Sequence, residues 1–202
     1  MEHHGASPGP SGLVAFAVAC YTFTGVFSGM VGPESLLLLA AWLAGGFVVQ
    51  IIVANKELDH GELLGGNVFC FFQGFFMLTG AISSICKWLC VFVFEVTYST
   101  VVEGFGWGAC TIALILWSPA YFKNANGTFS TAIIFTDIAL IGVTLNDFGI
   151  LPASLKIGVA ICLFIAGSLG LYCASAVQLN TAFGKTVLPL AKPLIKSTAS
   201  AK

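Results

Sequence analysis

Long apolar segments that are almost free of charge dominate this chain. Six of them reach the roughly 20 residues that a helix needs to cross a bilayer. They cover residues 12–31, 36–54, 64–85, 104–122, 128–145 and 155–177. The eight lysines and all but one of the nine acidic residues lie in or near the gaps between them. Because hydrocarbon does not solvate charge, this distribution predicts an all-α membrane protein with six transmembrane helices.

The composition also excludes several classes of function. Charged residues make up 8% of the chain, which is about a third of their share in a soluble domain. The net charge of −1 argues against a nucleic-acid partner. The sequence has no metalloprotease, serine-hydrolase or phosphate-binding-loop motif, so we expect neither an enzyme nor a bound cofactor. His3 and His4 stand in a polar tail and are a poor basis for a metal site.

The apolar pattern divides the chain into three regions. Residues 1–11 are predicted to form a polar N-terminal tail, residues 12–178 a six-helix transmembrane domain, and residues 179–202 a cytoplasmic C-terminal tail. With both termini cytoplasmic, six of the eight lysines fall on the inner side, in agreement with the positive-inside rule. Residues 1–9 contain no Lys or Arg, so the first segment is predicted to be a retained span. We expect a multi-pass protein of the plasma membrane, or of the inner membrane in a bacterium.

Residues 87–100 fit none of the six spans. They are apolar but too short to cross a bilayer alone. Trp88 and Tyr98 are typical of a membrane–water interface, so we predict an interfacial segment here. An extension of the third or the fourth span is the alternative.

Glycines recur inside the apolar segments. Examples are Gly25 with Gly29, Gly45 with Gly46, and Gly167 with Gly170. Small residues let the backbones of neighbouring helices approach closely where lipid gives no hydrophobic drive. The alternative is that these glycines line a narrow pore or loosen a helix for gating.

Asp137 is the one acidic residue deep inside an apolar segment. Ser130, Asp137 and Thr144 are seven residues apart, which is nearly two turns, so they share one helix face. Such a polar stripe faces either the bundle interior or a water path. Asp137 is therefore either a structural carboxyl paired with a hydroxyl of a neighbouring helix, or a pathway carboxyl. In the second case it can carry a proton, because apolar surroundings favour the protonated form.

Polar side chains in three other segments are candidate partners for Asp137. They are Gln50, Asn67, Gln73, Thr22 and Thr24. Together with Ser130 and Thr144, we expect Gln50, Asn67 and Gln73 to line a pathway for substrate and protons.

Motifs near both ends of the chain resemble those of the acetate uptake transporter family, the succinate–acetate permeases. Residues 7–13 read SPGPSGL and resemble the family's NPAPLGL signature, whereas residues 183–189 read FGKTVLP and closely match its closing sequence. Between them, Gly45-Gly46, Gln50, Glu57 and Gly61 are similar to a Gly-Gly…Gln…Glu…Gly run. Residues 72–76, FQGFF, resemble the family's Tyr-Gly-x-Phe-Trp.

The resemblance implies six helices per protomer, assembly as a homo-hexamer and a separate pathway in each protomer. Relatives move acetate, and in some cases succinate, and proton coupling is proposed for many of them. A ring of three hydrophobic side chains narrows their pathway. Matching by motif puts Phe16 and Phe72 in that ring, and the best register puts Asp137 at the third position, with Ile134 and Ile138 as alternatives.

We therefore expect a transporter or channel for acetate and similar small monocarboxylates that works by proton symport. Its expected partners are the small carboxylate substrate and membrane lipid. An ionised Asp137 in the pathway would repel anions, which favours a channel for a neutral or cationic small solute instead. A membrane scaffold or sensor of the same fold, in which Asp137 is only structural, is a further alternative.

Overall fold

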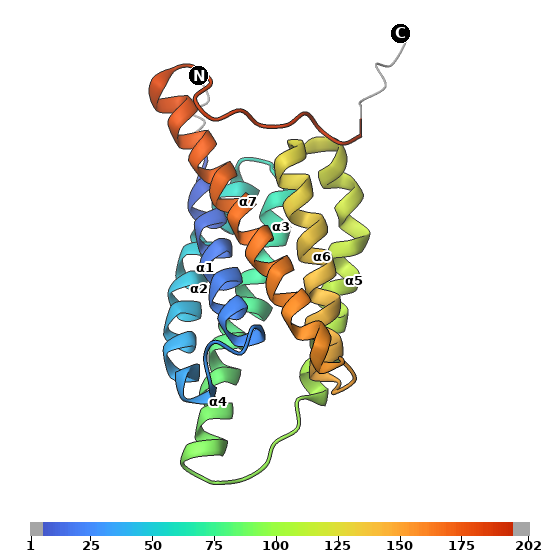
Figure 1. Ribbon diagram of the computed structural model, residues 1–202. Coiled ribbons are helices and arrows are strands. Elements are labelled where there is room, and N and C mark those ends of the chain that lie inside the picture. Colours follow the sequence, from blue (N-terminus) through green and yellow to red (C-terminus); the bar gives the residue numbers. More distant parts are fainter. Residues whose placement is uncertain (1–5, 196–202) are drawn as a thin grey trace.

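The chain is all-helical in the computed structural model, which describes residues 6–195 (Figure 1). The long helices are α1 (Gly9–Phe27), α2 (Leu36–Asp59), α5 (Val101–Asn124), α6 (Gly127–Asp147) and α7 (Lys156–Phe183). Between α2 and α5, α3 (Leu63–Phe71), the π-helical η2 (Phe72–Leu78) and α4 (Thr79–Phe92) follow one another without a break. Short 3₁₀ turns, η1 (Pro33–Ser35) and η3 (Ala153–Leu155), precede α2 and α7.

The prediction of six spans is confirmed. Within residues 6–195, six helical segments are long and apolar enough to cross a membrane, and the third is the continuous run Leu63–Phe92. Most of these helical segments are longer than the apolar stretches of sequence from which they were predicted. The first is displaced: it begins at Gly9, in a turn that accommodates Pro10. It ends at Phe27, just before Gly29 takes a φ of 74°.

Residues 87–100 divide between two kinds of structure. The first six continue α4 as far as Phe92, so the alternative of a longer third span is correct for them. Residues 93–100 are not helical and lead to the start of α5.

The helices close into a ring. α1 packs between α2 and α7, α6 packs between α7 and α5, and α3 completes the ring by touching both α2 and α5. Buried apolar side chains from several of these helices meet inside, among them Leu43, Leu114 and Leu140, each at most 1% exposed. These buried side chains fill part of the space that the ring of helices encloses.

Glycines on α7 allow α1 to approach it closely, as the sequence predicted. A Cβ atom added at Gly167 would lie 2.9 Å from the Cβ of Cys20, and one added at Gly170 would lie 3.0 Å from the ring of Phe16. By contrast, a Cβ at Gly158, on the same helix, would meet nothing within 4 Å. The close contact is thus specific to the stretch of α7 that faces α1.

The C-terminal segment remains in contact with one end of the helix bundle. α7 ends at Phe183, five residues beyond the predicted domain boundary at 178, where Gly184 takes the left-handed φ of 60° that often terminates helices. The chain then crosses the end of the bundle (Figure 1). Gly127 N–H donates to Ala191 C=O at 2.8 Å, and Ile195 N–H donates to Phe122 C=O at 2.9 Å. Residues 1–5, with His3 and His4, and residues 196–202 of the predicted tails lie outside the described part of the chain.

Gly167→Ala is expected to destabilise the protein, because its methyl group would force α1 and α7 apart. Overpacking of this kind costs about 1–3 kcal/mol. Gly158→Ala is the matched control on the same helix, and it is expected to be neutral or stabilising by about 0.5–1 kcal/mol. Unfolding of both variants in detergent, followed by circular dichroism, measures the difference. Equal stability of the two variants would contradict the assigned α1–α7 contact.

Candidate functional site

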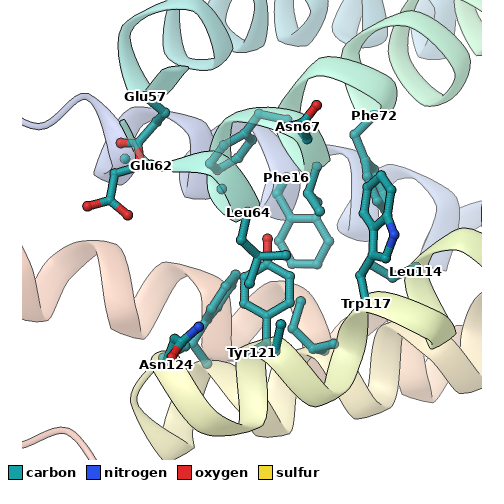
Figure 2. A pocket seen from close by; sticks show the side chains of 18 of the residues that line it. Phe16, Glu57, Glu62, Leu64, Asn67, Phe72, Leu114, Trp117, Tyr121 and Asn124 are labelled. Carbon is teal, nitrogen blue, oxygen red and sulfur yellow. The ribbon is translucent and has the colours of Figure 1, made fainter. Parts of the chain in front are cut away.

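The ring of helices holds two cavities, one toward each end of the bundle. Successive spans run in opposite directions, so the first halves of α1, α3 and α6 meet the second halves of α2 and α5 at one end. A cavity of about 980 Å³ lies among these five helix parts and the start of η2 (Figure 2). Its lining includes Leu13, Phe16, Gln50, Glu57, Asn67, Phe72, Leu114, Trp117, Tyr121, Ile133 and Thr136.

A second cavity, of about 680 Å³, lies toward the opposite end of the same helices. It is formed by the second halves of α1 and α6, the first halves of α2 and α5, and by η2 and α4. Its lining includes Phe23, Leu39, Phe76, Ser83, Lys87, Thr100, Glu103, Trp107, Cys110, Val143 and Asp147.

Buried aromatic side chains separate the two cavities. Phe72 lines the first and Phe76, one turn further, lines the second, with 5.5 Å between their ring centroids. Phe16 meets Phe72 edge to face at 6.4 Å. None of the three is more than 9% exposed. The structure thus brings together Phe16 and Phe72, the two aromatic residues that the sequence motifs assigned to a constriction.

The helix that carries Phe72 and Phe76 is irregular at this level. Residues 72–78 form the π-helix η2 inside an otherwise α-helical span. The hydroxyl of Thr79 donates to the carbonyl of Gly74 at 3.0 Å, on the C-terminal side of this segment. π-Turns inside α-helices are uncommon and are often found at functional sites. The irregularity coincides with the boundary between the cavities.

Two of the predicted polar pathway residues, Gln50 and Asn67, line the first cavity. Gln50 is 1% exposed, and its Oε1 has no hydrogen-bond partner among the described residues. The amide of Asn67 is exposed and donates to Leu63 C=O in its own helix at 2.7 Å. Glu57, whose Oε1 accepts a hydrogen bond of 3.2 Å from Ser7, stands with Glu62 at the same cavity (Figure 2).

Gln73 does not join these residues. It is buried and lines neither of the two cavities. Its Nε2 lies 3.9 Å from the sulfur of Cys70, in the preceding turn, and its Oε1 has no partner among the described residues.

The predicted polar stripe of α6 is confirmed as one face, and that face packs against α5. Ser130 Oγ donates to Tyr121 C=O at 3.1 Å. Ser118 Oγ donates to Asp137 Oδ2 at 2.7 Å, and the hydroxyls of Thr111 and Thr144 are 3.0 Å apart. Each member of the stripe therefore bonds to a residue of the neighbouring helix, as in the structural alternative stated for Asp137.

The structure gives two observations on Asp137 that the sequence did not suggest. Its partner is Ser118, which lies on a helix from which no candidate had been proposed. It also lines neither cavity, because the stripe to which it belongs is turned toward α5. The alternatives Ile134 and Ile138 are 36% and 50% exposed on the outside of the bundle.

A different stripe of α6 faces the cavities. Ile133 and Thr136 line the first cavity and Val143 and Asp147 line the second, whereas Leu140, 1% exposed, lies between them. Ile133, Leu140 and Asp147 are also seven residues apart. This second heptad series is present in the sequence, three residues out of register with the first, but its mostly apolar members give no polar signal that would distinguish it from a lipid-facing or core stripe.

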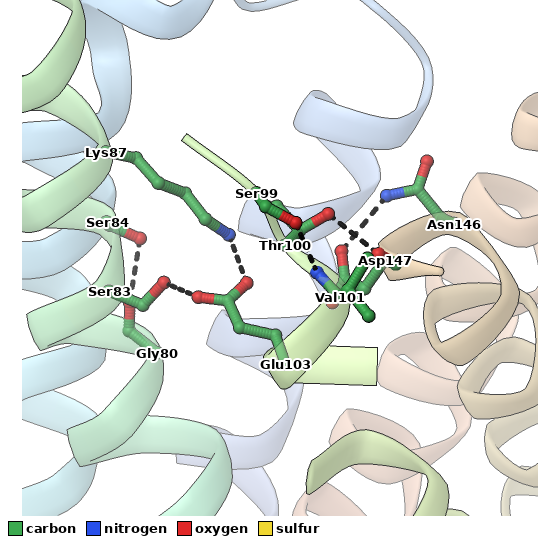
Figure 3. A network of polar contacts seen from close by, with 10 residues as sticks. All are labelled: Gly80, Ser83, Ser84, Lys87, Ser99, Thr100, Val101, Glu103, Asn146 and Asp147. Carbon is green, nitrogen blue, oxygen red and sulfur yellow. Dashed lines mark hydrogen bonds and ion pairs between the residues drawn. The ribbon is translucent and has the colours of Figure 1, made fainter. Parts of the chain in front are cut away.

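Polar contacts also cluster in the second cavity, where the sequence predicted no site (Figure 3). Glu103, in the first turn of α5, is held by Lys87 and by Ser83 from α4. Across the cavity, Asn146 Nδ2 donates to Asp147 Oδ1 at 3.2 Å, and Thr100 Oγ1 donates to Asp147 C=O at 2.7 Å. Lys87 and Glu103 stand at the edges of separate apolar segments, so no local pattern indicated their pairing.

Within residues 6–195, no three His, Cys, Asp or Glu side chains gather into a group that could hold a metal ion. The seven cysteines are all free thiols.

Comparison with known proteins gives a match of structure but not of sequence. No family model matches the chain, and no curated protein is similar enough in sequence to be matched. Among solved structures, that of the bacterial acetate channel SatP superimposes with a TM-score of 0.78 at 18% sequence identity. The match covers 93% of this chain and 99% of that one. The chain therefore shares its fold with this bacterial acetate channel.

Proposed function

We propose that this protein is a channel or transporter for acetate and similar small monocarboxylates. The observation that carries the proposal is the pair of cavities that face each other across Phe16 and Phe72, within a fold shared with an acetate channel. A path between the cavities has to pass these rings. Succinate, a longer dicarboxylate, is a candidate for a minor substrate.

The lining suits a molecule with one apolar and one polar end. The first cavity is lined by apolar side chains such as Phe16, Phe72 and Leu114, and the amide of Gln50 is among its few polar lining groups. A methyl group can contact the rings while a carboxyl group reaches an amide. Few polar groups in an apolar cavity are typical of sites for small ligands.

The charges at the first cavity favour movement of the acid together with a proton. Of the residues that line it, Glu57 and Glu62 are acidic and none is basic. A bare carboxylate would be repelled by these groups and would lose its hydration at the apolar boundary. Bringing a proton along removes most of both costs, so we propose proton-coupled transport.

The same charges also favour one competing function. A cavity with acidic and no basic lining residues would admit a small neutral or cationic solute. Uptake of labelled acetate and of labelled acetamide, its neutral analogue, into proteoliposomes separates the two functions. Transport of acetamide without acetate would support the alternative, and transport of neither would favour a scaffold or sensor.

The outer surface supports a setting in a cell membrane. Large apolar side chains point outward on several helices, including Leu38, Ile112 and Ile161, which are 53–70% exposed and line neither cavity. Such surfaces contact either lipid or a second copy of the chain. We propose a plasma-membrane protein with cytoplasmic termini that assembles as a homo-hexamer, in line with the motif resemblance.

Phe72→Ala is expected to widen the boundary between the cavities and to relax selection by size. The ratio of succinate to acetate uptake should rise about tenfold, which corresponds to a change of about 1.4 kcal/mol in relative barrier height. Uptake of both labelled acids into proteoliposomes measures the ratio. Phe164→Ala is the matched control, because Phe164 is 52% exposed and lines neither cavity. An unchanged ratio in a folded Phe72→Ala protein would contradict a constriction at this position.

Asp137→Asn is expected to leave acetate uptake and its pH dependence close to native. The amide can still accept the hydrogen bond of Ser118, and residue 137 lies at the α5–α6 contact, away from both cavities. Initial uptake rates across a pH series test this expectation. If the variant transports acetate but its uptake rate no longer depends on pH, Asp137 belongs to the proton pathway and the expectation is wrong.

A further inference from the structure

Lys87 has an exceptional position in this molecule. Of the residues that line the two cavities within the described part of the chain, it is the one cation. Its side chain is 25% exposed and extends from α4 into the second cavity, toward the start of α5 (Figure 3). A lysine inside the helix bundle of a membrane protein points to a functional role.

Lys87 donates to the carboxylate of Glu103, a group that resembles a small carboxylic acid bound covalently to the protein. The end of the Glu103 side chain is a methylene group with a carboxylate, as in acetate. One of its oxygens accepts from the ammonium of Lys87 and the other from the hydroxyl of Ser83. The two donors thus bind both oxygens of a carboxylate within the cavity.

The surrounding structure also favours an anion at this place. Thr100, Val102 and Glu103 belong to the start of the 24-residue helix α5 and line the cavity there. Free backbone N–H groups at a helix N-terminus attract negative charge. The start of α5 therefore adds to the attraction exerted by Lys87.

From these contacts we infer that Lys87 and Ser83 form a binding site for a small monocarboxylate, which Glu103 occupies as an internal competitor. The inference rests on the proposed function for the identity of the ligand. When acetate enters, its oxygens replace those of Glu103 at Lys87 and Ser83, and the side chain of Glu103 is displaced into the cavity.

This exchange has a consequence for protons. Lys87, Glu103 and Asp147 are the charged residues of the cavity, so their net charge is −1 when all are ionised. The other titratable groups that line it are Tyr98, from the loop before α5, and Cys110, on α5; α1, α2 and α7 add none. A displaced, ionised Glu103 would stand near Asp147 and the bound anion. Transfer of the proton of acetic acid to Glu103 balances the exchange, because it leaves acetate on Lys87 and a neutral Glu103 carboxyl.

Acetate binding to the purified full-length protein in nanodiscs tests the site. Titration calorimetry in two buffers of different ionisation enthalpy gives the dissociation constant and the number of protons taken up. For the native protein we expect about one proton per acetate, and a dissociation constant that rises by up to about tenfold per pH unit as the pH increases. Glu103→Gln should bind acetate about tenfold more tightly, because a neutral side chain competes weakly for Lys87. Its binding should take up almost no protons.

Three further variants complete the test. Glu34→Gln is the matched control, because Glu34 is an exposed acid of η1 that does not line the cavity, and it should behave like the native protein. Lys87→Met should lose the proton-linked binding, and Ser83→Ala should weaken it several-fold, which keeps the test informative if Lys87→Met fails to fold. The inference would be overturned if the folded Glu103→Gln variant bound acetate with native-like affinity and proton uptake. It would also be overturned if the two single variants Ser83→Ala and Lys87→Met both did so.

The proposed function can fail separately from this site. Proton-linked acetate binding in a protein that transports no acetate would support the site and contradict the function. Acetate transport with native-like binding in the Glu103→Gln variant would support the function and contradict the site.

Discussion

Polar groups buried in a membrane protein need partners within the protein, and this constraint shapes the whole bundle. On one face of helix α6, Ser130, Thr144 and the Oδ2 atom of Asp137 find such partners on α5, whereas Asp137 Oδ1 is buried without a hydrogen-bond partner among the described residues. The neighbouring face, with Ile133 and Leu140, is thereby turned toward the interior. The interior boundary depends on a second close contact, at Gly167 and Gly170, which brings α7 against α1 and sets Phe16 beside Phe72.

The two cavities that result differ in charge. The first has acidic residues at its lining and no base, whereas the second holds a lysine with two carboxyl groups around it. A weak acid that crosses between them meets amide and aromatic groups on one side and an ion pair on the other. In the proposed function, this asymmetry excludes a bare anion at the first cavity and, at the second, binds an anion that brings its proton.

The sequence was sufficient for some of these features and not for others. Span number follows from length and charge alone, and Phe16 and Phe72 follow from motifs with fixed spacing. Heptad spacing shows that Ser130, Asp137 and Thr144 share one face of their helix. It does not show which neighbouring helix packs against that face. The pairing of Lys87 with Glu103 joins two helices across a non-helical loop, and the π-helix at Phe72 has no sequence signal that we recognise, so both required the structure.

In the proposed function, the substrate path runs past Thr136, which lines the first cavity, and not past Asp137, its neighbour in sequence. Thr136→Cys and Asp137→Cys, each made in a protein whose native cysteines are replaced, can be compared by acetate uptake before and after reaction with a water-soluble thiol reagent. The two side chains differ by about 100° around the helix axis. Modification should block uptake through Thr136→Cys and leave uptake through Asp137→Cys intact. Block of the Asp137→Cys protein alone would contradict the path described by the two cavities.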